Sequence, residues 1–313
     1  MGTGATSRMK DRPGNGILHV TFELDDLRWT LTMGTGMGRP PRQRRVRPRD
    51  RAAVLGEIEE TKRRFGVVGG RTVSCYEAGR EGFWLHRWLV SEGIENRVVD
   101  SASIEVNRRK RRVKADRLDG KKLLRMLMRY EAGEKDVWSV VRVPSVEAED
   151  ARHLHRELTT LKRARVRVTN RTKGLLATQG VRLQLHEDFL ERIDEIRLWD
   201  GSRLPPRLRD RLQRAWERRT WLSERILHLE RNRRELLRSS TADDVERVRQ
   251  LMLLDGIGEN SAWVFVTEFF GWRRFNNRRE VAGLAGVTPA NYQSGATSHD
   301  QGISKAGNRH VRH

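Results

Sequence analysis

The sequence predicts an α/β domain followed by long helices and a mainly helical C-terminal domain. Between residues 17 and 99, short strand-like segments alternate with helical segments, as in a mixed sheet flanked by helices. From about residue 146, apolar residues keep close to heptad spacing over two long stretches. We therefore expect four parts: a disordered N-terminus (1–16), an α/β domain (17–145), a coiled-coil or helical segment (146–240) and a mainly helical domain (241–313).

The charge balance indicates a polyanionic partner. The 313 residues include 63 Lys and Arg against 42 Asp and Glu, a net charge of +21, and nucleic acid is the leading candidate. No segment has the long apolar run of a membrane-spanning helix, and residues 1–16 lack the apolar core of a secretory signal. The single cysteine, Cys75, excludes an intrachain disulfide and a cysteine-based zinc site. We expect a cytoplasmic, nucleoid-associated protein without a membrane partner.

The first strands carry a candidate acid. Residues 17–33 alternate between apolar and polar side chains on both sides of Asp25 and Asp26, which predicts two strands joined by a tight turn. Glu23 falls on the face opposite the apolar set. Ordinary exposure to solvent is the alternative to a functional role.

The next elements place a second acid at a strand end. Residues 34–51 are rich in Gly, Pro and Arg without periodicity. This predicts either a mobile loop whose arginines bind phosphates or a disordered, solvated linker. A helix (51–65) and a strand (72–76) follow, and Glu77 stands where that strand ends. Acids at strand ends are where such sheets gather ligands.

Two aspartates stand one helical turn apart. Asp116 and Asp119 precede apolar residues at helical spacing (123–130), so they share a face near a helix start. They could grip a hard divalent cation, or serve only as N-cap and first-turn acid. If Glu23 and Glu77 converge with this pair, the repulsion among four carboxylates requires cations. Oxygen-only ligands favour Mg²⁺ or Mn²⁺.

The second half of the chain reads as helices and turns. The two heptad stretches, separated at 201–206, could pair as an antiparallel coiled coil or form the seam of a homo-oligomer. A glycine turn at Gly256 and Gly258 between two helices predicts a helix-hairpin-helix that holds a phosphate through backbone N–H groups, or a plain helical hairpin. Residues 289–302 read as a polar loop. The apolar face expected after Arg309 is missing, so we expect the chain to lack its natural C-terminus.

Several motifs, in order along the chain, resemble the IS-one-ten group of insertion-sequence transposases. They are Tyr76-Glu77-Ala78-Gly79, Lys114-Ala115-Asp116-Arg117-Leu118-Asp119, Leu254-Asp255-Gly256-Ile257-Gly258, Arg274-Phe275, Leu284-Ala285-Gly286-Val287-Thr288-Pro289, Gln293-Ser294-Gly295 and Gly302-Ile303-Ser304-Lys305-Ala306-Gly307-Asn308. The resemblance implies an N-terminal RuvC-like domain of ribonuclease H fold with an Asp-Glu-Asp-Asp tetrad, a coiled-coil insertion, and a transposase domain with a nucleophilic serine. Members recombine DNA guided by a structured bridge RNA.

The resemblance assigns roles to the candidate acids. The tetrad, with catalytic and metal-binding roles, falls on Glu23, Glu77, Asp116 and Asp119. The first position departs from the usual aspartate of the group, because glutamate carries its charge one methylene further out. The neighbouring acids of the first turn, Asp25 and Asp26, therefore remain alternative ligands.

The serine of the resemblance falls on Ser294, which alone has the Gln-Ser-Gly setting; Ser298 and Ser304 are rival hydroxyls. Ser294 is expected to attack a DNA phosphodiester and form a transient phosphoserine, with Mg²⁺ on the tetrad neutralising charge. The expected nucleic-acid contacts are Arg39, Arg42, Arg44, Arg45, Arg47, Arg108, Arg109, Arg111, Arg112, Gly256, Gly258 and Lys305.

The expected partners are DNA at the element ends and target, a structured guide RNA and further copies of the chain, as a dimer or tetramer. Two other functions stay open. One is a RuvC-like Holliday-junction endonuclease that uses water as nucleophile. The other is an inactive, truncated nucleic-acid-binding remnant, suggested by the early end of the chain and by Glu23.

Overall fold

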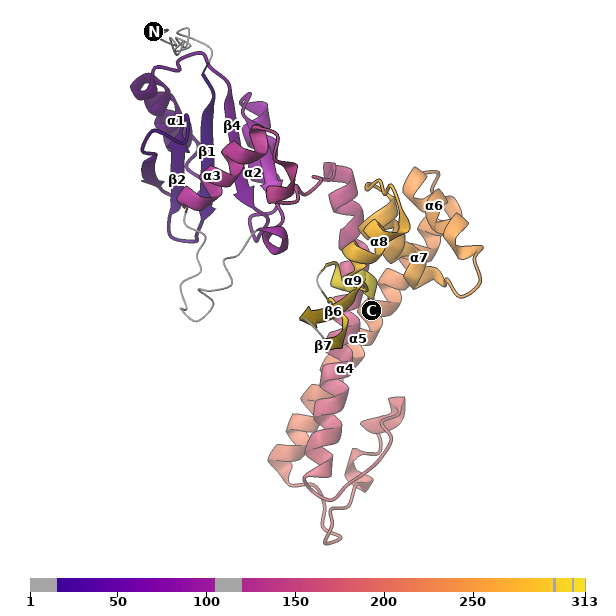
Figure 1. Ribbon diagram of the computed structural model, residues 1–313. Coiled ribbons are helices and arrows are strands. Elements are labelled where there is room, and N and C mark those ends of the chain that lie inside the picture. Colours follow the sequence, from indigo (N-terminus) through magenta and orange to yellow (C-terminus); the bar gives the residue numbers. More distant parts are fainter. Residues whose placement is uncertain (1–15, 105–119, 295–296, 306, 313) are drawn as a thin grey trace, which may run out of the picture. The chain divides into compact units, whose positions relative to one another are not determined.

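The structure is a computed structural model that describes residues 16–104, 120–294, 297–305 and 307–312, with only the backbone at 102, 290–294, 297–301 and 309. The chain divides into two compact units, unit 1 (1–143) and unit 2 (144–313) (Figure 1). Among the described residues, no helix combines the length and apolar character needed to span a bilayer.

Unit 1 is built on a five-stranded mixed sheet, which confirms the predicted α/β class for this part. The strands are β1 (Leu18–Leu24), β2 (Trp29–Gly34), β3 (Arg42–Val46), β4 (Thr72–Glu77) and β5 (Glu95–Val99), in the order β3-β2-β1-β4-β5. β2 runs antiparallel to β1 and β3, whereas β4 runs parallel to β1 and β5. The predicted hairpin of β1 and β2 is therefore confirmed.

Helices cover both faces of this sheet (Figure 1). On one face, α1 (Arg51–Phe65) and α2 (Trp84–Ser91) share an apolar cluster with Leu18, Val20 and Phe22. On the other, α3 (Gly120–Glu131) packs its leucines on Val73 and Cys75. The polar face of β1 is thus not exposed to solvent, because α3 covers it. Its Thr21 is fully buried, and the Thr21 hydroxyl donates to the Gly120 carbonyl (3.2 Å).

Part of the segment predicted as a mobile arginine-rich loop is the edge strand β3. The prediction is wrong for residues 42–46, which pair with β2 through backbone hydrogen bonds. Arg42 also pairs with Glu57 of α1 (2.6 Å) and donates to the Thr61 hydroxyl (2.7 Å). The strand was missed because its exposed residues are polar or charged, so no apolar alternation marks it, as is common for edge strands.

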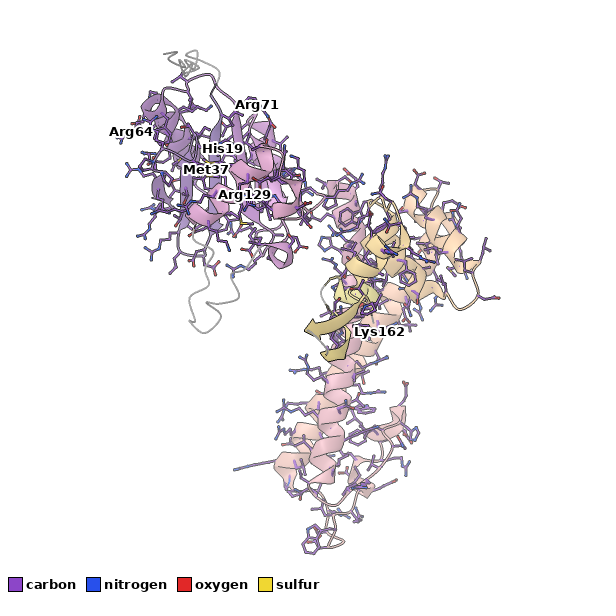
Figure 2. The ribbon with its side chains drawn as sticks, in the orientation of Figure 1. His19, Met37, Arg64, Arg71, Arg129 and Lys162 are labelled. Carbon is purple, nitrogen blue, oxygen red and sulfur yellow. The ribbon has the colours of Figure 1, made fainter. Side chains whose placement is uncertain are left out.

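Unit 2 begins with two long helices, α4 (Val146–Ala177) and α5 (Pro206–Ser239). They run antiparallel and pack on each other: Lys162, labelled in Figure 2, pairs with Glu230 (2.7 Å), and Leu176 packs with Leu212 and Trp216. Of the two predicted arrangements, the structure shows the pairing within one chain. The connection between the helices spans residues 178–205, far longer than the predicted break at 201–206.

The rest of unit 2 contains short helices and a hairpin. These are α6 (Asp243–Met252), α7 (Glu259–Phe265), the π-helical segment η6 (Val266–Phe270), α8 (Arg278–Ala285), β6 (Pro289–Ser294), β7 (Thr297–Ile303) and α9 (Arg309–Arg312). α6, α7 and η6 enclose a small apolar cluster that includes Val248 and Trp263. The predicted polar loop at 289–302 is wrong, because β6 and β7 form an antiparallel hairpin there.

Candidate functional site

Two of the predicted acids lie at one edge of the sheet, at the ends of neighbouring strands. β1 and β4 are neighbouring parallel strands in which Phe22 lies opposite Tyr76, so Glu23 and Glu77 come next at adjacent positions. Side chains alternate along a strand, and Cys75 packs under α3, so Glu77 belongs to the α3 face. Glu23 belongs to the same face, because its carboxylate lies against the start of α3.

The contact between Glu23 and α3 is close. A Cβ added to Gly120, the first residue of α3, would lie 2.6 Å from Glu23 Oε1 and would also meet Thr32 Oγ1. Gly120 follows Asp119 in the sequence. Asp116 and Asp119 themselves lie outside the described residues. The structure therefore brings Glu23, Glu77 and the start of α3 together.

Glu23 and Glu77 line a cleft of about 500 Å³. Arg28, Arg45 and Arg80 also line it, so the cleft combines carboxylates with cationic side chains. A cleft of this kind can accept a phosphate group beside a metal ion, because the cations attract the phosphate and the acids can hold the metal.

The surroundings of Glu77 disfavour its charged form. Burial raises the pKa of Glu77, and the nearby Asp100 carboxylate raises it further. Asp100 directly follows β5, whose Val99 pairs with Glu77. The sequence prediction missed Asp100, although its position just after a strand was the same signal that singled out Glu77. Like charges at one sheet edge favour a bound cation.

The alternative ligands of the first turn have local partners. Asp25 accepts a hydrogen bond from the Leu27 amide (2.9 Å) and also lines the cleft, and Asp26 pairs with Arg80. Glu23 is thus the acid of this hairpin that contacts α3, while Asp25 and Asp26 lie in the turn.

The arginines of residues 39–47 divide into two sets. Three of them contact α1. Arg39 donates to the Phe65 carbonyl (3.3 Å) and stacks on the Phe65 ring. Arg42 pairs with Glu57 and Thr61, and Arg44 Nε lies 3.4 Å from the Glu57 carboxylate. Within the described part of the chain, Arg45 and Arg47 have no carboxylate at ion-pairing distance. They are therefore the arginines of this set best placed for phosphates. Arg108, Arg109, Arg111 and Arg112 lie outside the described residues.

The predicted serine lies in unit 2, at the end of β6. Ser294 pairs with Thr297 through the backbone, next to the tip of the hairpin. Lys305 follows β7 with a left-handed backbone (φ 54°). In the predicted glycine turn, Gly256 is also left-handed (φ 83°) and Gly258 precedes α7, so two helices joined by a turn are present. Binding of phosphate there stays a prediction.

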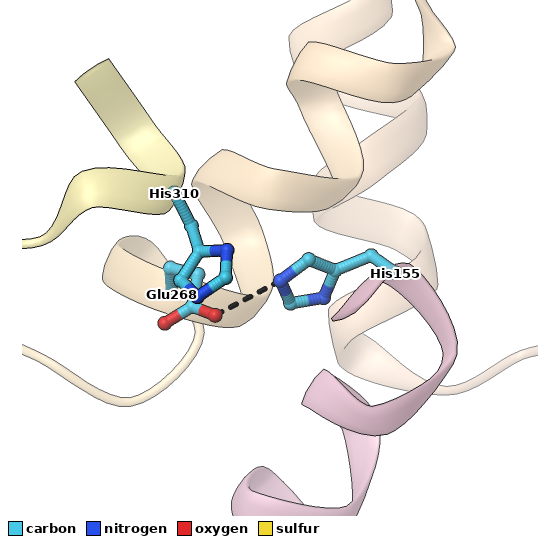
Figure 3. A group of neighbouring side chains, drawn as sticks. All are labelled: His155, Glu268 and His310. Atoms are coloured by element: carbon cyan, nitrogen blue, oxygen red, sulfur yellow. Dashed lines mark hydrogen bonds and ion pairs between the residues drawn. The ribbon is translucent and has the colours of Figure 1, made fainter. Parts of the chain in front are cut away.

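A buried cluster in unit 2 was not predicted. Atoms of His155, Glu268 and His310 that could bind a metal all lie within 4.8 Å of one another (Figure 3). Glu268 is 1% exposed. Its Oε1 accepts from His155 Nε2 (2.9 Å) and Arg156 Nε (2.7 Å), and its Oε2 accepts from Arg156 Nη2 (2.9 Å) and Asn308 Nδ2 (2.8 Å).

The Glu268 carboxylate is ionised and already satisfied. Burial opposes its charge, but the hydrogen bonds from His155, Arg156 and Asn308 outweigh burial and hold the pKa of Glu268 well below its usual range. Both oxygens have donors and Arg156 supplies a positive charge, so the cluster is an ion-pair network without need of a cation. Sequence patterns could not reveal it, because Glu268 lies among the apolar residues of a helix and its partners are 40 or more residues away.

A strongly basic chain with acids at one edge of an α/β sheet has the features of proteins that act on nucleic acid. Residues 248–313 match the model described as Transposase IS116/IS110/IS902 family. Over 310 residues the chain is 40% identical to "Putative transposase y4rJ" of Sinorhizobium fredii, covering 95% of this chain and 78% of that protein. The chain belongs to the IS116/IS110/IS902 family of transposases, which confirms the resemblance at the level of the family.

Two further relatives are more distant. The transposase for insertion sequence element IS1328 of Yersinia enterocolitica is 29% identical over 159 residues, covering 51% of this chain and 46% of that protein. The "Probable family 20 transposase" of Pseudomonas aeruginosa is 25% identical over 184 residues, covering 58% of this chain and 53% of that protein. The chain thus aligns with about half of the length of these two.

Proposed function

We propose that the protein is a DNA recombinase of an insertion sequence that exchanges strands through a covalent phosphoserine. The observation that carries this proposal is the placement of Glu23 and Glu77 in one cleft at the ends of β1 and β4, with Glu23 against the start of α3. The mixed sheet with helices on both faces agrees with a RuvC-like domain of ribonuclease H fold. The relatives named as transposases support the reaction class.

The donor set at the cleft fits Mg²⁺ or Mn²⁺. The groups offered are carboxylate oxygens, which these ions prefer, and burial together with the nearby Asp100 carboxylate raises the pKa of Glu77. Glu23 and Glu77 would hold the ion together with Asp116 and Asp119. When bound, the ion supplies positive charge to phosphoryl oxygens. Arg45 and Arg47 would attract the flanking phosphates.

In the proposed reaction, the Ser294 hydroxyl attacks a DNA phosphorus atom and loses its proton. The new serine–phosphate bond replaces one deoxyribose–phosphate bond, and the released deoxyribose oxygen takes up a proton. In the second step, a deoxyribose hydroxyl of the other strand attacks the phosphoserine and restores Ser294. The two transesterifications exchange strands without net hydrolysis.

The partners proposed for this reaction are those that the family resemblance implies. They are DNA at the element ends and at the target, a structured guide RNA, and further copies of the chain in a dimer or tetramer. The net charge of +21 supports nucleic-acid partners, because each bound phosphate releases counterions. Binding of both nucleic acids should therefore weaken steeply as salt rises.

The test is to trap the covalent intermediate. Protein, neighbouring RNA, Mg²⁺ and labelled element-end DNA are mixed, quenched with denaturant and separated. Wild-type protein and the matched control Ser298→Ala should give a covalent protein–DNA adduct, whereas Ser294→Ala should give none. An adduct with Ser294→Ala would contradict the role of this serine. If Ser294→Ala still cuts DNA but forms no adduct, the protein is instead an endonuclease that uses water. If the wild type binds DNA but neither cuts it nor forms an adduct, the protein is an inactive remnant.

A further inference from the structure

The buried Glu268 connects two parts of unit 2 that are far apart in sequence. His155 and Arg156 belong to α4, whereas Asn308 follows the β6–β7 hairpin. The carboxylate accepts from both sides, as Figure 3 shows for His155. Since Glu268 is buried and charged, loss of any donor would remove a hydrogen bond that stabilises this charge in a low-dielectric site. The network therefore fixes the position of Asn308 relative to α4.

Asn308 belongs to a clamp at the base of the hairpin. Backbone hydrogen bonds join the segment before β6 to the segment after β7. They run from the Ser304 amide to the Thr288 carbonyl (2.8 Å), from the Lys305 amide to the Gly286 carbonyl (3.0 Å), and from the Asn308 amide to the Leu284 carbonyl (2.7 Å). β6 thus begins and β7 ends at one fixed base, and Ser294 is the last residue of β6.

Gly307 lets the chain reach this clamp. Its φ of 126° lies in the range that favours glycine. A Cβ at Gly307 would collide with the Leu284 carbonyl oxygen and lie 3.0 Å from the Gly286 amide nitrogen. The adjacent Asn308 then uses both ends of its amide, since Nδ2 donates to Glu268 and Oδ1 accepts from the His310 amide (2.9 Å).

We propose that Glu268 is a positioning residue for Ser294: by holding Asn308, it anchors the base of the hairpin that carries the serine. This inference rests on the proposed function. A nucleophile gains rate only when its oxygen is held close to, and in line with, the reacting phosphorus, and a misplacement of about 1 Å can cost about 100-fold. A buried, charged anchor keeps the hairpin base in place without contacting DNA.

The experiment changes the polarity of the Glu268–Asn308 hydrogen bond. Asn308→Asp keeps the size and the acceptor for the His310 amide, but it turns a carboxylate toward Glu268. We expect adduct formation at saturating DNA to slow by about 10- to 100-fold, with the DNA dissociation constant little changed. Combining it with Glu268→Gln restores a donor facing an acceptor between positions 268 and 308, but the new amide group also faces Arg156 Nη2. This double variant should therefore regain part of the lost rate. The matched control Asn170→Asp makes the same chemical change at an exposed position of α4 and should react like the wild type.

A second measurement does not need the reaction. Hydrogen exchange of the amides in residues 288–304 should be faster in Asn308→Asp and return toward the wild-type rate in the double variant. If Asn308→Asp fails to fold, Asn308→Ser removes the donor to Glu268 more gently and should give an intermediate effect in both assays.

The outcomes separate this inference from the proposed function. A wild-type protein without an adduct would overturn the proposed function, and the exchange rates would still test the anchor. Unchanged exchange and adduct rates in Asn308→Asp would overturn the anchor. Zinc retained by the purified wild type and lost in His155→Ala would also overturn it, because the cluster would then be a metal site.

Discussion

The substitution Gly120→Ala tests the arrangement at the acid cleft. Gly120 is buried at the start of α3, and its missing side chain leaves room for Glu23 and Thr32. A methyl group there would lie 2.6 Å from Glu23 Oε1, well inside ordinary contact distance. Either the start of α3 must move away from β1, or the Glu23 carboxylate must turn. Each response changes the geometry of the proposed metal site.

The expected cost follows from two opposing effects. Alanine in place of glycine stabilises a helix interior by up to about 1 kcal/mol, and by less at the first residue of a helix. Forcing an extra methyl group into packed surroundings costs about 1–3 kcal/mol. The free energy of unfolding of unit 1 should therefore fall by about 1–2 kcal/mol.

Gly56→Ala is the matched control. Gly56 lies within α1, is exposed, and among the described residues no atom lies within 4 Å of an added Cβ. The same chemical change should stabilise the protein there by about 0.5–1 kcal/mol. Calorimetric melting with and without Mg²⁺ measures both effects. Gly120→Ala should also bind Mg²⁺ more weakly and form the DNA adduct more slowly, whereas Gly56→Ala should do neither.

One result would refute this reasoning. A Gly120→Ala protein that melts at or above the wild-type temperature and binds Mg²⁺ with wild-type affinity would show that Glu23 does not lie against α3 at a metal site. A loss of Mg²⁺ affinity in Gly56→Ala would show instead that the effect is not local to the cleft.

Three further predictions concern the metal, the nucleic acid and the fold. Because the pKa of Glu77 is raised, Mg²⁺ affinity should fall as pH drops through that raised value, beginning above the ordinary 4.5, and Glu77→Gln should flatten this dependence in calorimetric titrations. Replacing both Arg45 and Arg47 with glutamine should make the negative slope of the logarithm of the DNA association constant against log salt concentration less steep by about 1.4–1.8. An unchanged slope would exclude them as phosphate contacts. Leu212 is fully buried between α4 and α5, so Leu212→Ala should destabilise unit 2 by about 2–5 kcal/mol in urea denaturation, and a loss below 1 kcal/mol would contradict that packing.

The elements that were predictable from the sequence are those that bury apolar residues at a regular period. β1 and β2 were found by alternation, and the two long helices by their heptads. β3 and the β6–β7 hairpin were missed, because their pairing depends on backbone hydrogen bonds and their side chains are mostly polar. Pattern alone cannot identify such strands, since the same residues are typical of loops.

The candidate site shows a similar division. Glu77 could be singled out because an acid that ends a strand lies at a sheet edge. The contact of Glu23 with the start of α3 could not be predicted, since alternation separates the two faces of a strand without saying what covers each face. Asp100 and Glu268 acquire their roles only from neighbours distant in sequence, the first beside Glu77 and the second beside His155 and Asn308.

The polypeptide passes from unit 1 to unit 2 only once, between Val143 and Pro144, and each unit encloses apolar clusters of its own. A substitution that disrupts the packing of one unit therefore need not disrupt the packing of the other. In a multimer, a copy with a disabled cleft could still supply Ser294, the proposed nucleophile, to a neighbouring copy. The fold is therefore compatible with a reaction in which the cleft and the serine come from different subunits.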